Sequence, residues 1–145
     1  MTKRHKLLVI DDSEQVVDIL TRFLSQKYDV ITAYKGLDGL KIFEAHKGDI
    51  DLVITDLVMP DNMNGRELAE KLWLERPDLK VIFSSGYSAD IVGKDFRLEP
   101  EVNYLQKPYE PQTLVLAVRR CLDGKRVDNG GVGLLAGHPA AKAAD

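Results

Sequence analysis

The chain has 145 residues, the size of one ordinary domain, so we expect a single domain and no second catalytic domain. Its 20 basic and 23 acidic residues are well mixed and give a net charge of -3, which excludes the basic surface that nucleic-acid binding requires. The single cysteine, Cys121, excludes an intramolecular disulfide, and no signal peptide or long apolar stretch is visible, so we expect a cytoplasmic protein without a nucleic-acid or membrane partner.

Short apolar runs alternate with helix-like segments along the chain. We expect strands at residues 6–10, 29–33, 51–55, 80–84 and 103–106, with helical segments between them. Five strand–helix units of this kind are typical of an α/β fold built on a parallel sheet.

The first and last helical segments have the clearest apolar stripes. The first begins after Asp12 or Ser13 as cap, and its predicted buried stripe is Val16, Ile19, Leu20, Phe23 and Leu24. The last has Pro111 in its first turn, and its predicted stripe is Leu114, Ala117, Val118, Cys121 and Leu122. Cys121 is therefore expected to be a core residue.

Two segments depart from this pattern. Between residues 88 and 102, Gly93 and Pro100 interrupt the apolar spacing, so we expect a short or mobile fourth helix. After Asp123 the composition shifts to glycine and alanine without an aromatic residue. We therefore expect a folded domain at residues 1–123 and a disordered Gly/Ala-rich tail at residues 124–145.

Three aspartates follow two of the apolar runs. Asp11 and Asp12 end the first run, and Asp56 ends the third strand-like segment. If these strands are parallel neighbours, the three carboxylates meet at the carboxyl edge of the sheet, where open α/β folds bind ligands. Carboxylates about 4 to 5 Å apart repel by roughly 3 to 4 kcal/mol per pair at an effective dielectric near 20, so the cluster needs a cation. Oxygen ligands of this kind suit Mg²⁺.

The sequence also predicts a nucleophile and two further contacts. Asp56 precedes a loop rich in turn formers, so we expect its carboxylate to lie exposed at the strand end and to attack a phosphoryl group, while Asp11 and Asp12 hold the metal. Ser84 and Lys107 follow two other strand-like runs. A hydroxyl and an ammonium group at the same edge would bind phosphoryl oxygens.

Each of these residues also has an ordinary explanation when it is taken alone. An aspartate pair before a helix is most often a cap, and an aspartate before a proline loop is turn chemistry. A serine at a strand end and a lysine are most often a local hydrogen-bonding group and a solvated cation. Their joint occurrence at one sheet edge is improbable by chance, which favours a functional site.

Four motifs occur in a familiar order: Asp11-Asp12, Asp56-Leu57-Val58-Met59-Pro60, Ser84-Ser85-Gly86-Tyr87 and Tyr104-Leu105-Gln106-Lys107-Pro108-Tyr109. With them the chain resembles the receiver domain of two-component response regulators, over about residues 6–122. The loop at residues 61–65 is similar to that of receivers attached to hybrid sensor kinases, so a hybrid-kinase-like or a stand-alone receiver is expected. The resemblance implies a flavodoxin-like, doubly wound sheet of five parallel strands in the order 2-1-3-4-5.

The resemblance also implies roles for the site residues. Asp56 matches the phosphoacceptor, and Asp11, Asp12, Asp56 and the main-chain carbonyl of Val58 match the Mg²⁺ ligands. Lys107 matches the phosphate-contacting lysine, which in the family usually precedes a cis peptide bond to proline.

Two residues match the conformational switch of the family. Ser84 matches the switch hydroxyl and Tyr104 the aromatic switch, although a tyrosine here is also compatible with an ordinary core or rim aromatic. The implied function is a phosphoacceptor module: a histidine kinase or phosphotransfer protein phosphorylates Asp56 in a Mg²⁺-dependent reaction, and a conformational switch then controls an output partner protein that the sequence does not identify. Such a module is no enzyme, because it catalyses at most its own phosphorylation and dephosphorylation.

Three other functions share parts of this pattern. A Mg²⁺-dependent phosphohydrolase of the haloacid-dehalogenase type also forms an aspartyl phosphate, but that family needs Asp-x-Asp where this chain has adjacent aspartates. A flavin-binding module of the same fold needs a phosphate loop where Asp11 and Asp12 would repel the ligand. A pseudo-receiver that keeps the fold without phosphorylation is the third, and the intact site argues against it.

Overall fold

The computed structural model describes residues 4–46, 48–59, 63–86 and 103–123. Within them the chain forms the strands β1 (Lys6–Ile10), β2 (Asp29–Ala33), β3 (Ile50–Asp56), β4 (Lys80–Ser85) and β5 (Tyr104–Gln106). The helices are α1 (Glu14–Leu24), α2 (Gly36–Ala45), α3 (Gly65–Glu75) and α4 (Pro111–Asp123). The helix expected within residues 88–102 and the tail expected at residues 124–145 lie outside the described residues.

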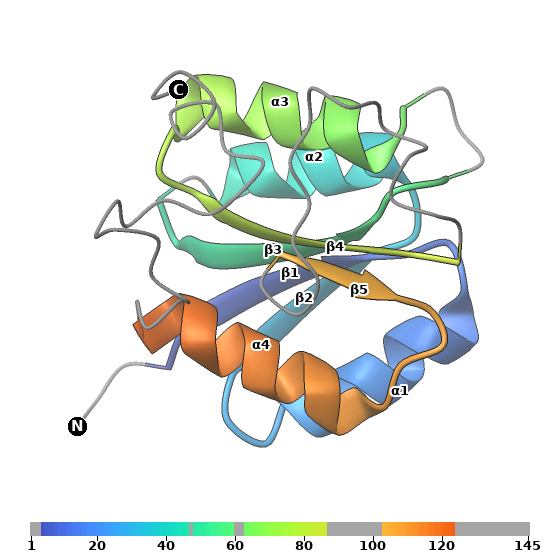
Figure 1. The fold of residues 1–145 in the computed structure, drawn as a ribbon. Helices are drawn as coiled ribbons and strands as arrows, with labels where there is room; N and C mark the ends of the chain where they lie inside the picture. Colours follow the sequence, from blue (N-terminus) through green and yellow to red (C-terminus); the bar gives the residue numbers. More distant parts are fainter. Residues whose placement is uncertain (1–3, 47, 60–62, 87–102, 124–145) are drawn as a thin grey trace, which may run out of the picture.

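The strands form one parallel sheet with the order β2-β1-β3-β4-β5 (Figure 1). This confirms the predicted doubly wound, flavodoxin-like order. It places β1 directly beside β3, and β4 between β3 and β5. Since all five strands run in the same direction, their carboxyl ends lie along one edge of the sheet.

Both faces of the sheet are covered by helices, with α2 and α3 on one face and α1 and α4 on the other (Figure 1). Side chains alternate between the faces along each strand. In β1, Leu8 and Ile10 pack in the layer of α2 and α3, whereas Leu7 and Val9 pack in the layer of α1 and α4. A strand covered on both faces needs apolar residues at every position, which explains the uninterrupted apolar run of β1.

The buried face of α1 differs from the predicted stripe. Its buried residues are Val17, Leu20 and Leu24. Ile19 and Phe23, which were predicted to be buried, are 44% and 38% exposed. The apolar residues of α1 span a wide arc. The helix packs against the sheet on one side and α4 on another, so the remaining part of the arc faces solvent. Ser13 is the N-cap, since its side chain accepts a hydrogen bond from the Val16 amide.

The predicted stripe of α4 is confirmed at four of its five positions, and the fifth, Leu122, is partly buried against the same apolar layer. The helix begins at Pro111, and its buried residues are Leu114, Ala117, Val118 and Cys121. Cys121 is therefore a core residue, as expected. A search of the described helices finds none with the length and apolar character needed to span a membrane.

The start of α3 packs directly against the end of β3. Asn64 and Glu67 form a reciprocal capping box that begins the helix. Gly65, which follows Asn64, donates a hydrogen bond from its main-chain amide to the carbonyl of Leu57 at 2.9 Å. A Cβ atom at Gly65 would lie 2.3 Å from the main-chain oxygen of Asp56, which is too close for any side chain. This glycine therefore fixes how β3 ends.

We predict that Gly65→Ala destabilises the protein by at least about 2 kcal/mol, because the clash is with backbone that has no room to shift. Urea unfolding followed by circular dichroism would measure the change. Gly86→Ala is the matched control, since a Cβ at Gly86 meets no atom of the described residues within 4 Å, and its free energy of unfolding should change by less than about 0.5 kcal/mol. Equal stability of the two variants would contradict the prediction.

Candidate functional site

The register of the sheet brings the ends of four strands together. Asp11 directly follows β1, and Asp56, the last residue of β3, pairs with Ser84 of β4. Lys107 directly follows β5, and its main-chain amide donates to the carbonyl of Ser85 at 2.8 Å. The residues predicted from four separate segments therefore share one edge of the sheet.

The three predicted aspartates converge. Carboxylate oxygens of Asp11, Asp12 and Asp56 all lie within 4.8 Å of one another. Asp11 and Asp56 are buried, whereas Asp12 is exposed at the rim. The cluster thus has two buried acids and one exposed acid, so it lies at the boundary between the protein interior and solvent.

Asp56 is only 6% exposed, so the prediction of an exposed carboxylate was wrong. β3 continues through Asp56, and the next residue, Leu57, is buried at 1% exposure. The hydrogen bond from Gly65 to Leu57 folds the chain after the strand back onto its end. The turn residues in the sequence indicated a loop, but they did not indicate that Gly65, at the start of α3, packs against the end of the strand.

Lys107 holds the two buried acids together. Its Nζ atom lies 2.8 Å from Oδ2 of Asp11 and 3.2 Å from Oδ2 of Asp56. Both distances are those of charge-assisted hydrogen bonds, which are stronger than bonds between neutral groups. The lysine predicted to contact phosphate therefore bridges two carboxylates in this structure.

The main chain orients the same two carboxylates from the opposite side. The amide of Ser13 donates to Oδ1 of Asp11 at 2.9 Å, and the amide of Val58 donates to Oδ1 of Asp56 at 3.3 Å. Each acid is thus held at both oxygens. Such support keeps reactive groups within the narrow range of positions that chemistry requires.

Burial and neighbouring charges shift the ionisation of the site. Burial raises the pKa of Asp56, and Asp11 raises it further, while Lys107 lowers it without cancelling the rise. Burial lowers the pKa of Lys107, but its contacts with Asp11 and Asp56 outweigh burial, so the net pKa is raised. The lysine therefore stays cationic, and the acids crowd against one another.

The donor set fits a hard divalent cation. Three carboxylates face one ammonium group, which leaves an excess of negative charge at the site. Oxygen donors at an edge that is open to water are what Mg²⁺ prefers, because it retains several of its waters. Asp11, Asp12 and Asp56 would hold the ion. A ligand role for the main-chain carbonyl of Val58 stays a prediction.

The two predicted switch residues are both buried. Ser84 is 2% exposed, and Tyr104 is 4% exposed and belongs to the apolar layer of α2 and α3. Tyr104 pairs with Phe83 across β4 and β5, so it is one strand position from Ser84. The peptide bond between Lys107 and Pro108 is cis, as the resemblance implied.

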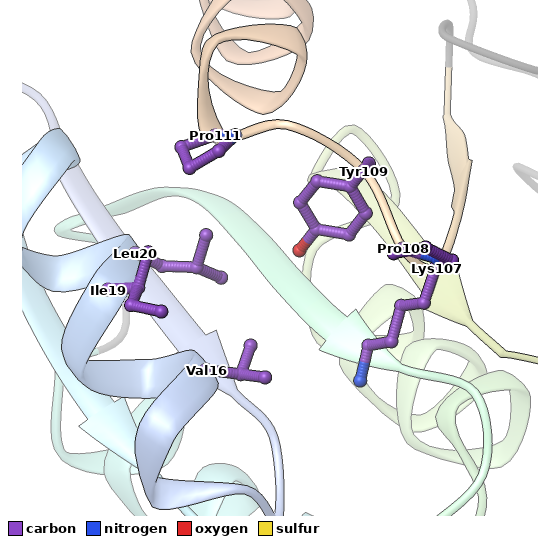
Figure 2. A pocket seen from close by; sticks show the side chains of 7 residues that line it. All are labelled: Val16, Ile19, Leu20, Lys107, Pro108, Tyr109 and Pro111. Carbon is purple, nitrogen blue, oxygen red and sulfur yellow. The ribbon is translucent and has the colours of Figure 1, made fainter.

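An apolar pocket, which no sequence pattern indicated, shares Lys107 with the site. It has a volume of about 290 Å³ and lies between α1 and the segment that joins β5 to α4 (Figure 2). Its lining residues are Val16, Ile19, Leu20, Lys107, Pro108, Tyr109 and Pro111. Lys107 belongs to both the pocket and the acid cluster, so the two are continuous. Only the packing of two distant segments creates this pocket.

Tyr109 is the residue of this region whose importance was missed. It occurs in the last motif, but no role was predicted for it. Its ring lines the pocket, and its hydroxyl is buried. A tyrosine beside a proline has no distinguishing sequence signal, because only its surroundings in the fold show what the hydroxyl faces.

Comparisons with known proteins agree on one family. A model of the response regulator receiver domain matches residues 7–119. Over 117 residues the chain is 32% identical to the sensor kinase CckA of Brucella abortus, covering 81% of this chain and 12% of that protein.

Two solved structures have a similar fold and similar sequence. A receiver domain protein from Clostridium thermocellum has a TM-score of 0.72 and 29% identity, over 83% of this chain and 96% of that one. The receiver domain of the hybrid histidine kinase CckA has a TM-score of 0.67 and 30% identity, over 81% of this chain and 98% of that one. The similarity therefore covers whole receiver domains, whereas the chain spans a small part of the full sensor kinase.

We predict that Asp56→Asn stabilises the protein at pH 7 by about 1 kcal/mol, because it removes a buried charge beside Asp11. The folded-state pKa of Asp56 lies above its unfolded value of 3.8, so the ionised group costs stability above the folded-state pKa. That cost disappears below pH 3.8. The advantage of the variant, measured by urea unfolding without added metal, should therefore shrink as the pH falls from 7 to 3.5.

Asp18→Asn is the control for this comparison, because it makes the same change at an exposed position of α1. It should change stability by less than about 0.5 kcal/mol at either pH. A loss of stability in Asp56→Asn at pH 7 would show that the contact of Asp56 with Lys107 outweighs burial and repulsion.

Proposed function

The chain belongs to the response regulator receiver domain family, and on that premise we propose that residues 1–123 accept a phosphoryl group on Asp56 in a Mg²⁺-dependent reaction. The observation that carries this proposal is the convergence of Asp11, Asp12 and Asp56 within 4.8 Å, with Lys107 in contact with two of them. Carboxylates for a metal, a nucleophile and a cation for phosphoryl oxygens are the parts that phosphoryl transfer needs.

The donor is a phosphohistidine of a histidine kinase or phosphotransfer protein. One carboxylate oxygen of Asp56 attacks the phosphorus in line with the bond to the histidine nitrogen. The new O–P bond forms as the N–P bond breaks, and the bonding electron pair returns to the imidazole. Contacts from Val58 and Lys107 hold the attacking carboxylate in place, which reduces the entropy lost on reaching the reactive geometry.

Lys107 changes partners during this reaction. Its ammonium group contacts the carboxylates of Asp11 and Asp56 before transfer. A phosphoryl group on Asp56 brings further negative oxygens to the same position. The flexible side chain of Lys107 then moves its ammonium group into contact with these oxygens. When bound, Mg²⁺ neutralises the carboxylates and the phosphoryl oxygens together.

The phosphoryl group then biases two conformations of the domain. Ser84 pairs directly with Asp56, so its hydroxyl is positioned to donate to a phosphoryl oxygen. Tyr104 lies one position away on β5 and is buried, and it is the second residue that we assign to this switch. A modification that binds one conformation better than the other shifts their populations. The output is a changed surface near β5 and α4, which an effector protein recognises.

The module itself turns over no substrate other than its own phosphoryl group. A phosphohydrolase of the haloacid-dehalogenase type needs a second aspartate two residues after its nucleophile, and here that position is Val58. The chain spans about one-eighth of its sensor kinase relative. It acts either as the receiver of a hybrid kinase or as a separate protein of the cytoplasm.

The phosphodonor docks on the apolar pocket beside the site. A protein donor must bring its histidine to Asp56 at the open edge, so it contacts the rim around that edge. The pocket adjoins that rim through Lys107. Ile19, which lines the pocket, is 44% exposed, and Phe23, one turn further along α1, is 38% exposed. Burial of such residues against a helix of the donor provides hydrophobic contact area.

The phosphorylation itself is tested by intact-mass spectrometry after incubation with acetyl phosphate. We expect the protein to gain one phosphoryl group only with Mg²⁺ present, because the crowded carboxylates repel an anion otherwise. Asp56→Asn should gain none, whereas Asp78→Asn, an exposed aspartate before β4 at the other sheet edge, should gain one. Unchanged mass in the folded wild-type protein with Mg²⁺ would favour a pseudo-receiver.

The docking surface is tested with Ile19→Ala. Phosphotransfer is measured from purified, autophosphorylated histidine kinases of the organism that encodes this chain, and acetyl phosphate provides the reference rate. The ratio of the two rates should fall about threefold to tenfold, because the variant removes apolar contact needed only by a protein donor. Leu74→Ala on α3, which is 85% exposed on the opposite face, should leave the ratio unchanged. Equal ratios for both variants would place the docking surface elsewhere.

A further inference from the structure

The hydroxyl of Tyr109 is buried, and its oxygen has no hydrogen-bond partner among the residues that the structure describes. Buried hydroxyls in native proteins nearly always have a partner, so an unpaired one calls for an explanation. The ring is accounted for, because it lines the apolar pocket between α1 and the segment that follows β5 (Figure 2). A phenylalanine would serve that purpose equally well. The hydroxyl needs a reason of its own.

The groups around this hydroxyl all belong to the proposed phosphorylation site. Burial raises the pKa of Tyr109 to about 12, opposed by Lys107 and Ser84 and reinforced by Asp11 and Asp56. The hydroxyl therefore keeps its proton at physiological pH and is available as a donor. The charges of Lys107, Asp11 and Asp56 therefore act on the Tyr109 hydroxyl.

Ser84 is a candidate for the partner of this hydroxyl. It is close enough to Tyr109 to lower the pKa of the phenol, yet the two hydroxyls do not meet the distance and angle of a hydrogen bond in this state. Ser84 is itself buried and pairs with Asp56 across β3 and β4. A small movement of Ser84 is therefore enough to satisfy the Tyr109 hydroxyl, and a group on Asp56 is the natural cause of that movement.

We propose that Tyr109 is a positioning residue for Ser84 in the phosphorylated state. The Tyr109 hydroxyl donates to Oγ of Ser84, and the Ser84 hydroxyl donates its proton to a phosphoryl oxygen on Asp56. Chains of hydrogen bonds strengthen each member, and the far end here is an anion. In the unmodified protein this donor has no partner among the described residues, and phosphorylation supplies one. This inference rests on the proposed phosphorylation of Asp56.

The test uses Tyr109→Phe, which keeps the ring and removes the oxygen, together with Ser84→Ala and the double variant. The probe is beryllofluoride with saturating Mg²⁺, a mimic of the aspartyl phosphate. Its apparent dissociation constant is measured from the rise in Tm with probe concentration. Tyr28→Phe is the matched control, because it makes the same change at a buried tyrosine just before β2, at the opposite sheet edge.

We expect Tyr109→Phe to weaken beryllofluoride binding about threefold to tenfold when Ser84 is present. In the Ser84→Ala background the same change should have less than about a 1.5-fold effect, because the hydroxyl then has no serine to orient. Without the probe, Tyr109→Phe should keep or raise the Tm, since it removes an unpaired buried hydroxyl. Tyr28→Phe should leave the affinity unchanged. A merely structural role would instead lower the Tm in both states.

The inference on Tyr109 is overturned if the variant binds beryllofluoride as the wild type does, or if its effect is equal with and without Ser84. A lower Tm of Tyr109→Phe without the probe would also overturn it, because it would show a bond already made in the unmodified state. If the wild-type protein binds no beryllofluoride and accepts no phosphoryl group, the proposed function fails and the inference fails with it. The wild-type result therefore separates the two failures.

Discussion

The bridge from Lys107 to Asp11 and Asp56 is the interaction on which the site depends. Two carboxylates at the ends of neighbouring parallel strands lie close together at the same sheet edge, so they repel each other. One ammonium group at 2.8 and 3.2 Å from them offsets this repulsion and fixes their oxygens. Because Lys107 follows β5, the bridge also ties the end of the outer strand to the ends of β1 and β3. The Nζ atom of Lys107 therefore both neutralises the acids and connects the ends of three strands.

The same arrangement leaves the site short of positive charge, and this deficit is what makes it responsive. Burial and Asp11 keep the pKa of Asp56 raised despite Lys107. Residues at functional sites often stabilise the fold less than other residue types would at the same positions, and the remaining structure offsets that cost. Here two apolar layers cover both faces of the sheet, and Gly65 holds the end of β3 against α3. A rigid support around an unbalanced charge cluster allows a bound cation or a phosphoryl group to have a large effect.

One short segment connects the charge cluster to the surface that we assign to the donor. Lys107 reaches the acids, while Tyr109 and Pro111 line the pocket against α1. Contact with the donor, phosphorylation of Asp56 and the position of Ser84 therefore all act on the same few residues between β5 and α4. This closeness gives a physical reason why the hydrogen bonding of the Tyr109 hydroxyl, in the pocket wall, depends on whether Asp56 is phosphorylated.

The sequence by itself determined the strands, the sheet that they form and most of the site. Uninterrupted apolar runs predicted strands covered on both faces, and polar residues at their carboxyl ends predicted that Asp11, Asp12, Asp56, Ser84 and Lys107 would share an edge. This succeeded because strand direction and the period of two along a strand are local properties. Motifs in a fixed order then supplied the strand order, which spacing alone does not specify.

Only the tertiary structure decided three further properties. It buried Asp56, because the chain after β3 folds back through a hydrogen bond from Gly65. It rotated α1 so that Ile19 and Phe23 face solvent, a choice that a wide apolar arc leaves undetermined. It also buried the Tyr109 hydroxyl without a hydrogen-bond partner among the residues that the structure describes. Each property depends on contacts between residues distant in the chain, whereas the sequence pattern reports only on neighbours along it.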